Sequence, residues 1–407
     1  MSKLFSKIKI WIRHNYYKIV NSIAFYPAFI SLTFLIVSII AIRFDFSEMG
    51  KSLKSNVEWL NLQDADTARN IIGVIAAGIL SLTVFSFSMV MIVLNQAASK
   101  MSNRVLNKLI GNSFQQVVLG VYIGTIMFAL FLHTTIRDID SGIHIPAIST
   151  YLLIILAVID IFIFIYFIHF ITQSVKYEVI IHRILNDTEK SMKNKCTLKS
   201  LPQPIDDINF QNDIVAPVAG VYEGIDTKNL LQLCKSNDIT VKVKYEPGVY
   251  VLKNTPVLEV DKPISEDVVK KLQTTLIINQ DETIENNYLY GFRQLSEVAI
   301  KALSPGINDP GTACLALRAL FYLLDCRINS FPENIIKDDN NISRIYSISP
   351  NFEAIAKTAI LPIWDYGKND RIIQNELSQL INQFLVLHRN NWLNQFLNEV
   401  EKTSNNN

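Results

Sequence analysis

The residue in this sequence with the most capacity for chemistry is an acid inside an apolar stretch. Asp160 lies midway between Ile145 and Thr172, in a segment otherwise free of charged residues apart from His169. An ionised carboxylate at the centre of a lipid bilayer costs several kcal/mol unless it is paired or hydrated. A pore, a proton relay and a pairing partner would each explain Asp160, so a functional and a structural interpretation both stay open.

His169 follows Asp160 in the same stretch and suggests a proton relay at first sight. Nine residues rotate a helix by about 900°, which places the two side chains on opposite faces. A direct pair within one helix is therefore excluded. His169 is instead expected near the inner membrane interface, where an amphipathic ring is stable.

A second polar pattern recurs every seven residues, at Ser81, Ser88 and Asn95. Such a stripe faces protein or water and not lipid. It could line a wet path, or its hydroxyls could bond the preceding helical turn at a contact between helices. Small residues favour close helix packing as well: Gly73, Ala77, Gly78 and the Gly120-x-x-x-Gly124 motif.

The most distinctive motif reads Ser-Pro-Gly-Ile-Asn-Asp-Pro-Gly-Thr, from Ser304 to Thr312. Its proline and glycine end one helix, Asn308 or Asp309 caps the next, and Pro310 takes the first helical position. Free amides at a helix start can receive an anion, although capping alone explains the pattern. The candidate ligand residues in the second half of the chain are Asp281, Thr283, Arg293, Ser304, Asn308, Asp309 and Thr312.

Other classes of site are disfavoured. The six histidines lie outside the 304–312 motif, and no nucleophile elbow, P-loop or HExxH pattern occurs, so an enzyme is the weakest interpretation and no catalytic residue is assigned. The four cysteines form no CxxC pair, so neither a metal site nor a disulfide framework is indicated, and no cofactor is expected. A net charge of +1 argues against nucleic acid as a partner.

The elements that must position these residues begin with four apolar segments, each near the length of about 20 residues that crosses a bilayer. They are Ser22 to Ile42, Asn70 to Leu94, Phe114 to Ile136, and Ile145 to Thr172. They predict a four-helix transmembrane domain over residues 22–172, preceded at residues 1–21 by a basic amphipathic helix that lies on lipid. Lys and Arg flank the spans in a pattern that predicts cytoplasmic N- and C-termini.

The second half predicts a cytoplasmic α+β domain. Helical spacing continues through a stalk at 173–199, and short strands separated by Gly and Pro predict a small β-rich module at 200–264. That module resembles barrel-sandwich carrier domains in outline but lacks their Met-Lys-Met attachment pattern. A helical subdomain at 265–402 and a disordered tail at 403–407 complete the prediction.

The chain resembles a family of predicted bacterial membrane proteins, numbered 2254 among the domains of unknown function. The resemblance covers most of the chain and is most specific in the string from Arg293-Gln294-Leu295 to Ser304 through Pro310. Glu282 stands where the family pattern usually has an arginine, which weakens an anion site built on Asp281 and Thr283. The resemblance implies an architecture and no established reaction.

Two functions follow as hypotheses. The first is a homo-oligomeric channel or transport-like protein for an ion, with a cytoplasmic regulatory domain. The absence of a visible inverted repeat favours a channel over a secondary transporter. The second is a membrane-tethered sensor or scaffold that binds a small anion or a protein through its cytoplasmic domain.

Overall fold

The computed structural model describes residues 24–56, 64–100, 113–136, 145–199 and 209–405. The chain divides into two compact units, Met1–Lys176 and Tyr177–Asn407, each of which is considered by itself. The interfacial helix expected at residues 1–21 lies outside the described residues.

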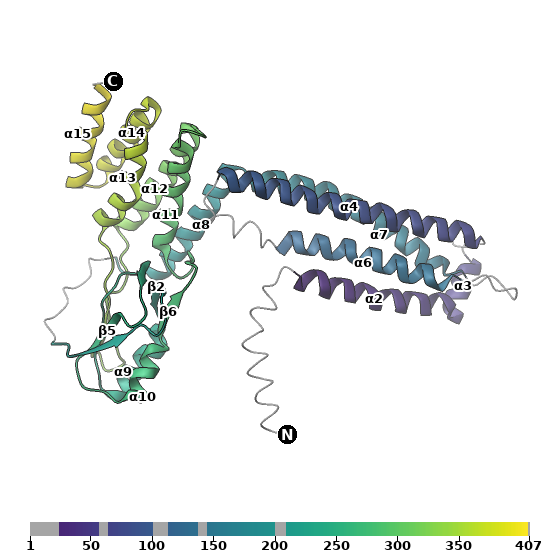
Figure 1. The fold of residues 1–407 in the computed structure, drawn as a ribbon, viewed down its shortest axis with the longest axis horizontal. Helices are drawn as coiled ribbons and strands as arrows, with labels where there is room; N and C mark the ends of the chain where they lie inside the picture. The colour runs from purple at the N-terminus through teal and green to yellow at the C-terminus, as the bar shows by residue number, and fades with distance from the viewer. Residues whose placement is uncertain (1–23, 57–63, 101–112, 137–144, 200–208, 406–407) are drawn as a thin grey trace. The chain divides into compact units, whose positions relative to one another are not determined.

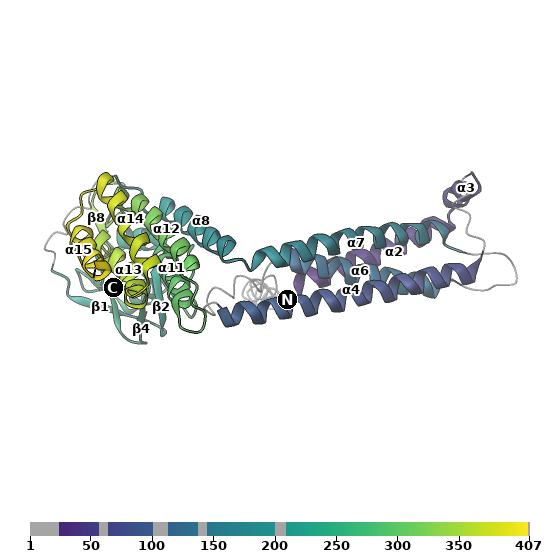
Figure 2. The same cartoon turned by 90° about the horizontal axis from the view of Figure 1, so that it is seen from above.

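The first unit is a bundle of apolar helices. It contains α2 (Phe25–Phe46), α3 (Glu48–Asn56), α4 (Ala65–Lys100), α6 (Ser113–Thr135) and α7 (Ala147–Ser174). Four of these, α2, α4, α6 and α7, are long and apolar enough to cross a membrane, and they run side by side in both views (Figures 1 and 2). The four predicted apolar helices are therefore confirmed, and α4 continues beyond the predicted span at both ends.

Close packing holds α2 against α6. A Cβ added at Gly124 would lie 2.6 Å from the Phe34 ring, and one added at Gly120 would lie 2.9 Å from Ile30. Only glycine permits this approach, so the predicted packing role of the Gly120-x-x-x-Gly124 motif is confirmed. A Cβ added at Gly73 or Gly78 of α4 would have no atom within 4 Å among those considered.

The segment expected as a stalk differs from that expectation. α7 ends at Ser174, and α8 (Tyr177–Lys195) begins after a short break. α8 packs on α11 (Tyr288–Leu303) and α12 (Pro310–Ile328) because Thr188 sits directly over Gly291. It is thus a core helix of the second unit, with Ile180, Ile181 and Ile184 buried.

The second unit contains two small sheets. The first has the order β1-β5-β3-β8-β7 and the second β4-β2-β6. The strands are β1 (Asn212–Val215), β2 (Gly220–Ile225), β3 (Val241–Val243), β4 (Val249–Val251), β5 (Pro256–Val260), β6 (Leu276–Asn279), β7 (Ile335–Lys337) and β8 (Ser343–Tyr346). The helices α9 (Thr227–Asn237) and α10 (Glu266–Gln273) belong to the same part of the chain.

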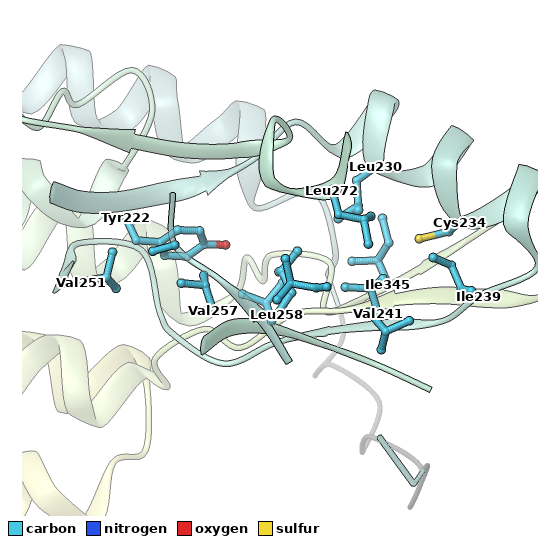
Figure 3. Close-up of a cluster of buried hydrophobic side chains, with 14 residues drawn as sticks. Tyr222, Leu230, Cys234, Ile239, Val241, Val251, Val257, Leu258, Leu272 and Ile345 are labelled. Carbon is cyan, nitrogen blue, oxygen red and sulfur yellow. The ribbon is translucent and has the colours of Figure 1, made fainter. Parts of the chain in front are cut away.

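This topology corrects the predicted barrel-sandwich module. The described strands form two open sheets and no closed barrel. Strands β6, β7 and β8 come from beyond residue 264, and β8 pairs in parallel with β3 through Val241 and Ile345. The physical reason is a shared core, in which Ile345 lies among Val241, Leu258 and Leu272 (Figure 3).

The remaining helices are α13 (Phe352–Gly367), α14 (Arg371–Leu387) and α15 (Asn391–Asn405). The prediction of disorder from residue 403 is wrong for Thr403 to Asn405, which continue α15. The Thr403 hydroxyl donates to the Glu399 carbonyl at 2.9 Å, and Val400 one turn earlier is buried.

Candidate functional site

Asp160 lies near the middle of α7 and is fully buried, with 0% of its surface exposed. Neither carboxylate oxygen has a hydrogen bond among the described residues. The hydroxyl of Thr125 on α6 is close enough to influence the carboxylate but does not reach hydrogen-bond geometry. A buried carboxylate without partners is unusual, because desolvation strongly disfavours its charge.

Three more polar side chains surround the same position. Ser86 of α4 and Tyr122 and Thr125 of α6 are each fully buried, and none of their hydroxyls has a hydrogen-bond partner among the described residues. The hydroxyls of Tyr122 and Ser86 approach each other, and Asp160 lies close enough for its charge to act on Tyr122. We call Ser86, Tyr122, Thr125 and Asp160 the buried polar cluster.

Apolar layers bound the buried polar cluster on both sides. One includes Ile72, Phe128, Leu132 and Leu153 from α4, α6 and α7. The other includes Val93, Val118, Phe167 and Ile171 from the same three helices, and Tyr122 of the buried polar cluster packs with them. The cluster is therefore a polar layer enclosed between two hydrophobic ones, near the midpoint of the apolar helices.

The chemistry of the cluster is set by its atoms, since it offers one carboxylate and three hydroxyls. Oxygen ligands of this kind suit a proton, a water molecule or a hard cation, and not a soft metal. No group of three or more His, Cys, Asp or Glu side chains that could hold a metal occurs in the described part of the chain. The single carboxylate of Asp160, when ionised, carries one negative charge, which one bound proton or monovalent cation would balance.

Asp45 is a second buried acid in the same bundle, and its carboxylate has protein partners. This residue, in the last turn of α2, is also completely buried. Its carboxylate accepts the Ser149 backbone N–H at 2.7 Å and the Ile148 N–H at 3.1 Å, so it caps the start of α7. Lys54 pairs with it at 3.2 Å. Asp45 is a structural residue that the sequence reasoning did not identify.

The other polar residues singled out in the membrane half lie elsewhere. Ser81, Ser88 and Asn95 are exposed on the outer face of α4, and His169 is exposed on α7. The Ser81 and Ser88 hydroxyls donate to the carbonyls of Ala77 and Val84, each at 2.9 Å. Within one chain the structure does not bring this stripe together with Asp160.

The Ser304–Thr312 turn is bonded within itself. Asp309 caps α12 by accepting from the Thr312 N–H at 3.1 Å and the Thr312 hydroxyl at 2.6 Å. The Ser304 hydroxyl donates to the Lys301 carbonyl at 2.7 Å, and Asn308 adopts a positive φ of 47°. Capping and turn geometry thus account for these polar groups.

Asp281, Thr283 and Arg293 lie at the opposite end of α11. Eleven residues of helix separate Arg293 from Ser304, a rise of about 16 Å. Thr283 donates to the buried Glu223 carboxylate from its backbone N–H at 2.6 Å, Arg293 pairs with Glu282, and Asp281 is exposed. Burial raises the pKa of the Glu282 carboxyl, while the Arg293 guanidinium acts in the opposite direction. The seven candidate ligand residues therefore form no single site.

The helices and the globular unit together define a class: a membrane protein with four candidate spans and a mixed helical domain that carries small sheets. Within that class, the chain belongs to the family described as Predicted membrane protein (DUF2254), whose model matches residues 20–383. The family resemblance stated from the motifs is confirmed.

Two curated relatives are uncharacterised proteins of Mycobacterium bovis and Mycobacterium tuberculosis. Each is 24% identical over 333 residues, which is 77% of this chain and 63% of the relative. The chain thus spans less than two thirds of the length of these relatives. No solved structure matches the chain.

Sequence reasoning missed Ser86, Tyr122 and Thr125. Tyr122 and Thr125 are three residues apart and share a helix face, which was a usable signal. Ser86 falls outside the seven-residue stripe that drew attention to its neighbour Ser88. Only the rotation of each helix in the bundle shows which polar residues meet Asp160.

Proposed function

We propose that this protein binds a proton or a small monovalent cation at Asp160 and passes it across the membrane, as a transport-like protein. The observation that carries this proposal is a buried carboxylate whose two oxygens, like the three hydroxyls beside it, find no partner within the described parts of the chain. Polar atoms left without partners in a core are costly, so their retention calls for an occupant.

The electrostatics of the carboxylate support a cationic occupant. An ionised Asp160 in an apolar interior requires a positive partner, and a neutral Asp160 requires a bound proton. Both states place one exchangeable positive charge at the cluster. Divalent cations normally recruit more carboxylates than the single one present here, which favours a monovalent ion.

The apolar layers on either side of the cluster support a gated path. A permanently open pore would carry polar side chains along its length, whereas here hydrophobic layers enclose the polar one. Movement of an ion then requires α4, α6 and α7 to separate on one side at a time.

Flux through proteoliposomes tests the proposal. Purified protein is reconstituted, and H⁺, Na⁺ and K⁺ movement is recorded under imposed gradients with Asp160→Asn alongside the wild type. We expect flux from the wild type and none from Asp160→Asn, because the amide cannot carry the compensating charge. A wild type that moves none of the three ions would sink the proposal.

A matched pair of variants locates the path. Thr125→Val removes a hydroxyl from the cluster and keeps the side-chain shape, so flux should fall by about tenfold. Thr33→Val removes an exposed hydroxyl on α2 that only bonds the Phe29 carbonyl, and it should leave flux unchanged. Equal effects of the two substitutions would contradict a path through the cluster.

We also propose that the protein is a homo-oligomer in a bacterial cytoplasmic membrane with both termini in the cytoplasm. The Lys and Arg flanks support the orientation, and the exposed Ser81, Ser88 and Asn95 stripe supports contact with another copy. Oxidative cross-linking should join copies that carry Ser88→Cys and not copies that carry Thr33→Cys. The reverse pattern would place the contact on α2.

A second candidate function is ligand sensing by the globular unit. Its support is a cavity of about 270 Å³ whose wall includes Pro247, Gly248 and Arg293. Ala354→Leu would narrow this cavity from an exposed position on α13. A screen of metabolite anions by thermal shift on the full chain tests the function, and hits that survive Ala354→Leu would exclude this cavity.

A further inference from the structure

A separate cavity of about 340 Å³ lies in the globular unit, where the end of α12 meets the starts of α13 and α15. Its wall includes Arg327 from α12, Asn351 and Glu353 at the start of α13, and Asn390 immediately before α15. Neither the sequence motifs nor the proposed ion path uses this cavity.

Arg327 is buried, with 2% of its surface exposed. Its guanidinium donates to the Tyr288 hydroxyl at 3.2 Å, the Ser330 carbonyl at 2.7 Å and the Pro350 carbonyl at 3.3 Å. A guanidinium has five N–H groups, so two are left over after these three bonds. The guanidinium also lies 5.5 Å from the centre of the Phe331 ring.

The Arg327 charge has no acidic partner among the described residues, since every ion pair there joins other groups. Two ionisable groups that interact with Arg327, the Cys196 thiol and the Tyr288 hydroxyl, do not supply a negative charge either. Burial raises the pKa of the Cys196 thiol and of the Tyr288 hydroxyl, which keeps both neutral at physiological pH. A buried cation that lacks a counter-ion is strongly unfavourable unless an anion joins it.

Two helix starts converge on the same cavity. Asn351 caps α13 by accepting from the Ala354 N–H at 2.8 Å, and Asn390 caps α15 by accepting from the Leu393 N–H at 2.9 Å. Each cap uses the side-chain oxygen, so each amide nitrogen remains a donor. The positive ends of both helix dipoles add to the field of Arg327.

We propose that this cavity binds an oxyanion, a phosphate or carboxylate group, between Arg327 and the starts of α13 and α15. Phe331, Pro332 and Phe352 add apolar surface to the wall, so the anionic group belongs to a molecule with an apolar part. Glu353 is the one acid in the wall, and Lys357 pairs with it at 2.6 Å.

The test uses the full chain in a neutral detergent and phenyl phosphate as the probe, with chloride at equal ionic strength as the reference. Binding is read from the shift of thermal unfolding and from calorimetric titration. Asn351→Asp keeps the helix cap but adds a negative charge at the cavity, so affinity should fall by at least about tenfold. Glu353→Gln removes a negative charge and should raise the affinity.

Ser265→Asp is the matched control, because it adds the same charge at the N-cap of α10, outside the cavity wall. Its affinity for phenyl phosphate should equal that of the wild type. Absence of saturable binding to the wild type, or an equal loss in Asn351→Asp and Ser265→Asp, would overturn the proposal. The affinity for dioctanoyl phosphatidate is measured in the same way. Tighter binding of the phosphatidate would indicate a lipid headgroup as the natural ligand, and tighter binding of phenyl phosphate would indicate a soluble phosphate compound.

Discussion

Two buried aspartates in one helical bundle have opposite surroundings. Asp45 has two backbone N–H donors and a lysine, whereas Asp160 has no hydrogen bond among the described residues. Burial removes the hydration of both carboxylates, but only for Asp45 do hydrogen bonds and an ion pair offset the lost free energy. The residue with a structural role and the residue proposed to hold an exchangeable ligand thus differ in their bonds and not in their burial.

The first prediction concerns these two residues. Asp45→Asn should lower the unfolding temperature, at a cost of about 2 kcal/mol, because it removes the pair with Lys54 and weakens the cap of α7. Asp160→Asn should raise it, since a neutral amide costs less to bury than a carboxylate that must first take up a proton or a cation. Unfolding of the detergent-solubilised variants measures both. A lower unfolding temperature for Asp160→Asn would show that Asp160 has a stabilising partner.

The second prediction concerns pH and Asp338, whose side chain is 1% exposed and bonds Arg344 at 2.9 Å. This pair lowers the pKa of Asp338 below its usual 3.8, so its contribution to stability is present above that pH and is lost as the pH falls through the lowered value. Asp338→Asn should therefore lower the unfolding temperature at pH 7, and the gap from the wild type should close in strong acid. A gap that is independent of pH would contradict the assignment.

At this scale the sequence predicted Asp160 and not its neighbours. An acid inside a long apolar run is visible without a structure. The identity of Ser86, Tyr122 and Thr125 as its neighbours depends on how α4 and α6 are rotated in the bundle, which apolar composition does not encode.

At the scale of elements, glycine marks where helices touch. Gly120 and Gly124 lie directly against α2, while Gly73 and Gly78 face outward on α4. The four apolar helices were predictable because length and composition suffice for them. Strands β7 and β8 were not, because β8 pairs with β3, which lies about a hundred residues earlier, and three- or four-residue strands leave little periodicity.

The third prediction tests the glycine contact. Gly124→Ala should destabilise the protein by about 1–3 kcal/mol, because the added methyl overlaps the Phe34 ring. Gly78→Ala should be neutral or slightly stabilising, since its Cβ meets no atom and alanine favours a helix. Unfolding curves of the two variants give the comparison, and equal effects would argue against the α2–α6 packing.

At the scale of the whole molecule, the chain consists of two compact units of different composition. The first is a bundle of apolar helices, and the second has its own core of buried residues around Tyr222, Val241 and Leu258. Helix α8 belongs to the second unit because Ile180, Ile181 and Ile184 are buried there. A division of labour follows, with ion movement proposed for one unit and anion recognition for the other.

The fourth prediction is that residues 177–407 fold without the apolar helices. Expressed alone, this fragment should be soluble and should unfold in one cooperative transition, because its core is complete within the unit. A fragment that begins at residue 196 lacks α8 and should aggregate, since the surfaces of α11 and α12 that α8 covers would be exposed. Circular dichroism and size-exclusion chromatography compare the two, and equal behaviour would remove α8 from the core.

The bond between Asp45 and the start of α7 also has a consequence for the order of synthesis. Asp45 leaves the ribosome 103 residues before Ile148, the first amide that it accepts. At about 5–20 residues per second, the acid waits roughly 5–20 s for that partner. Lys54 emerges only nine residues after Asp45 and can neutralise it in the interval. The carboxylate at the end of α2 can therefore reach its backbone partners only after the start of α7 has been synthesised.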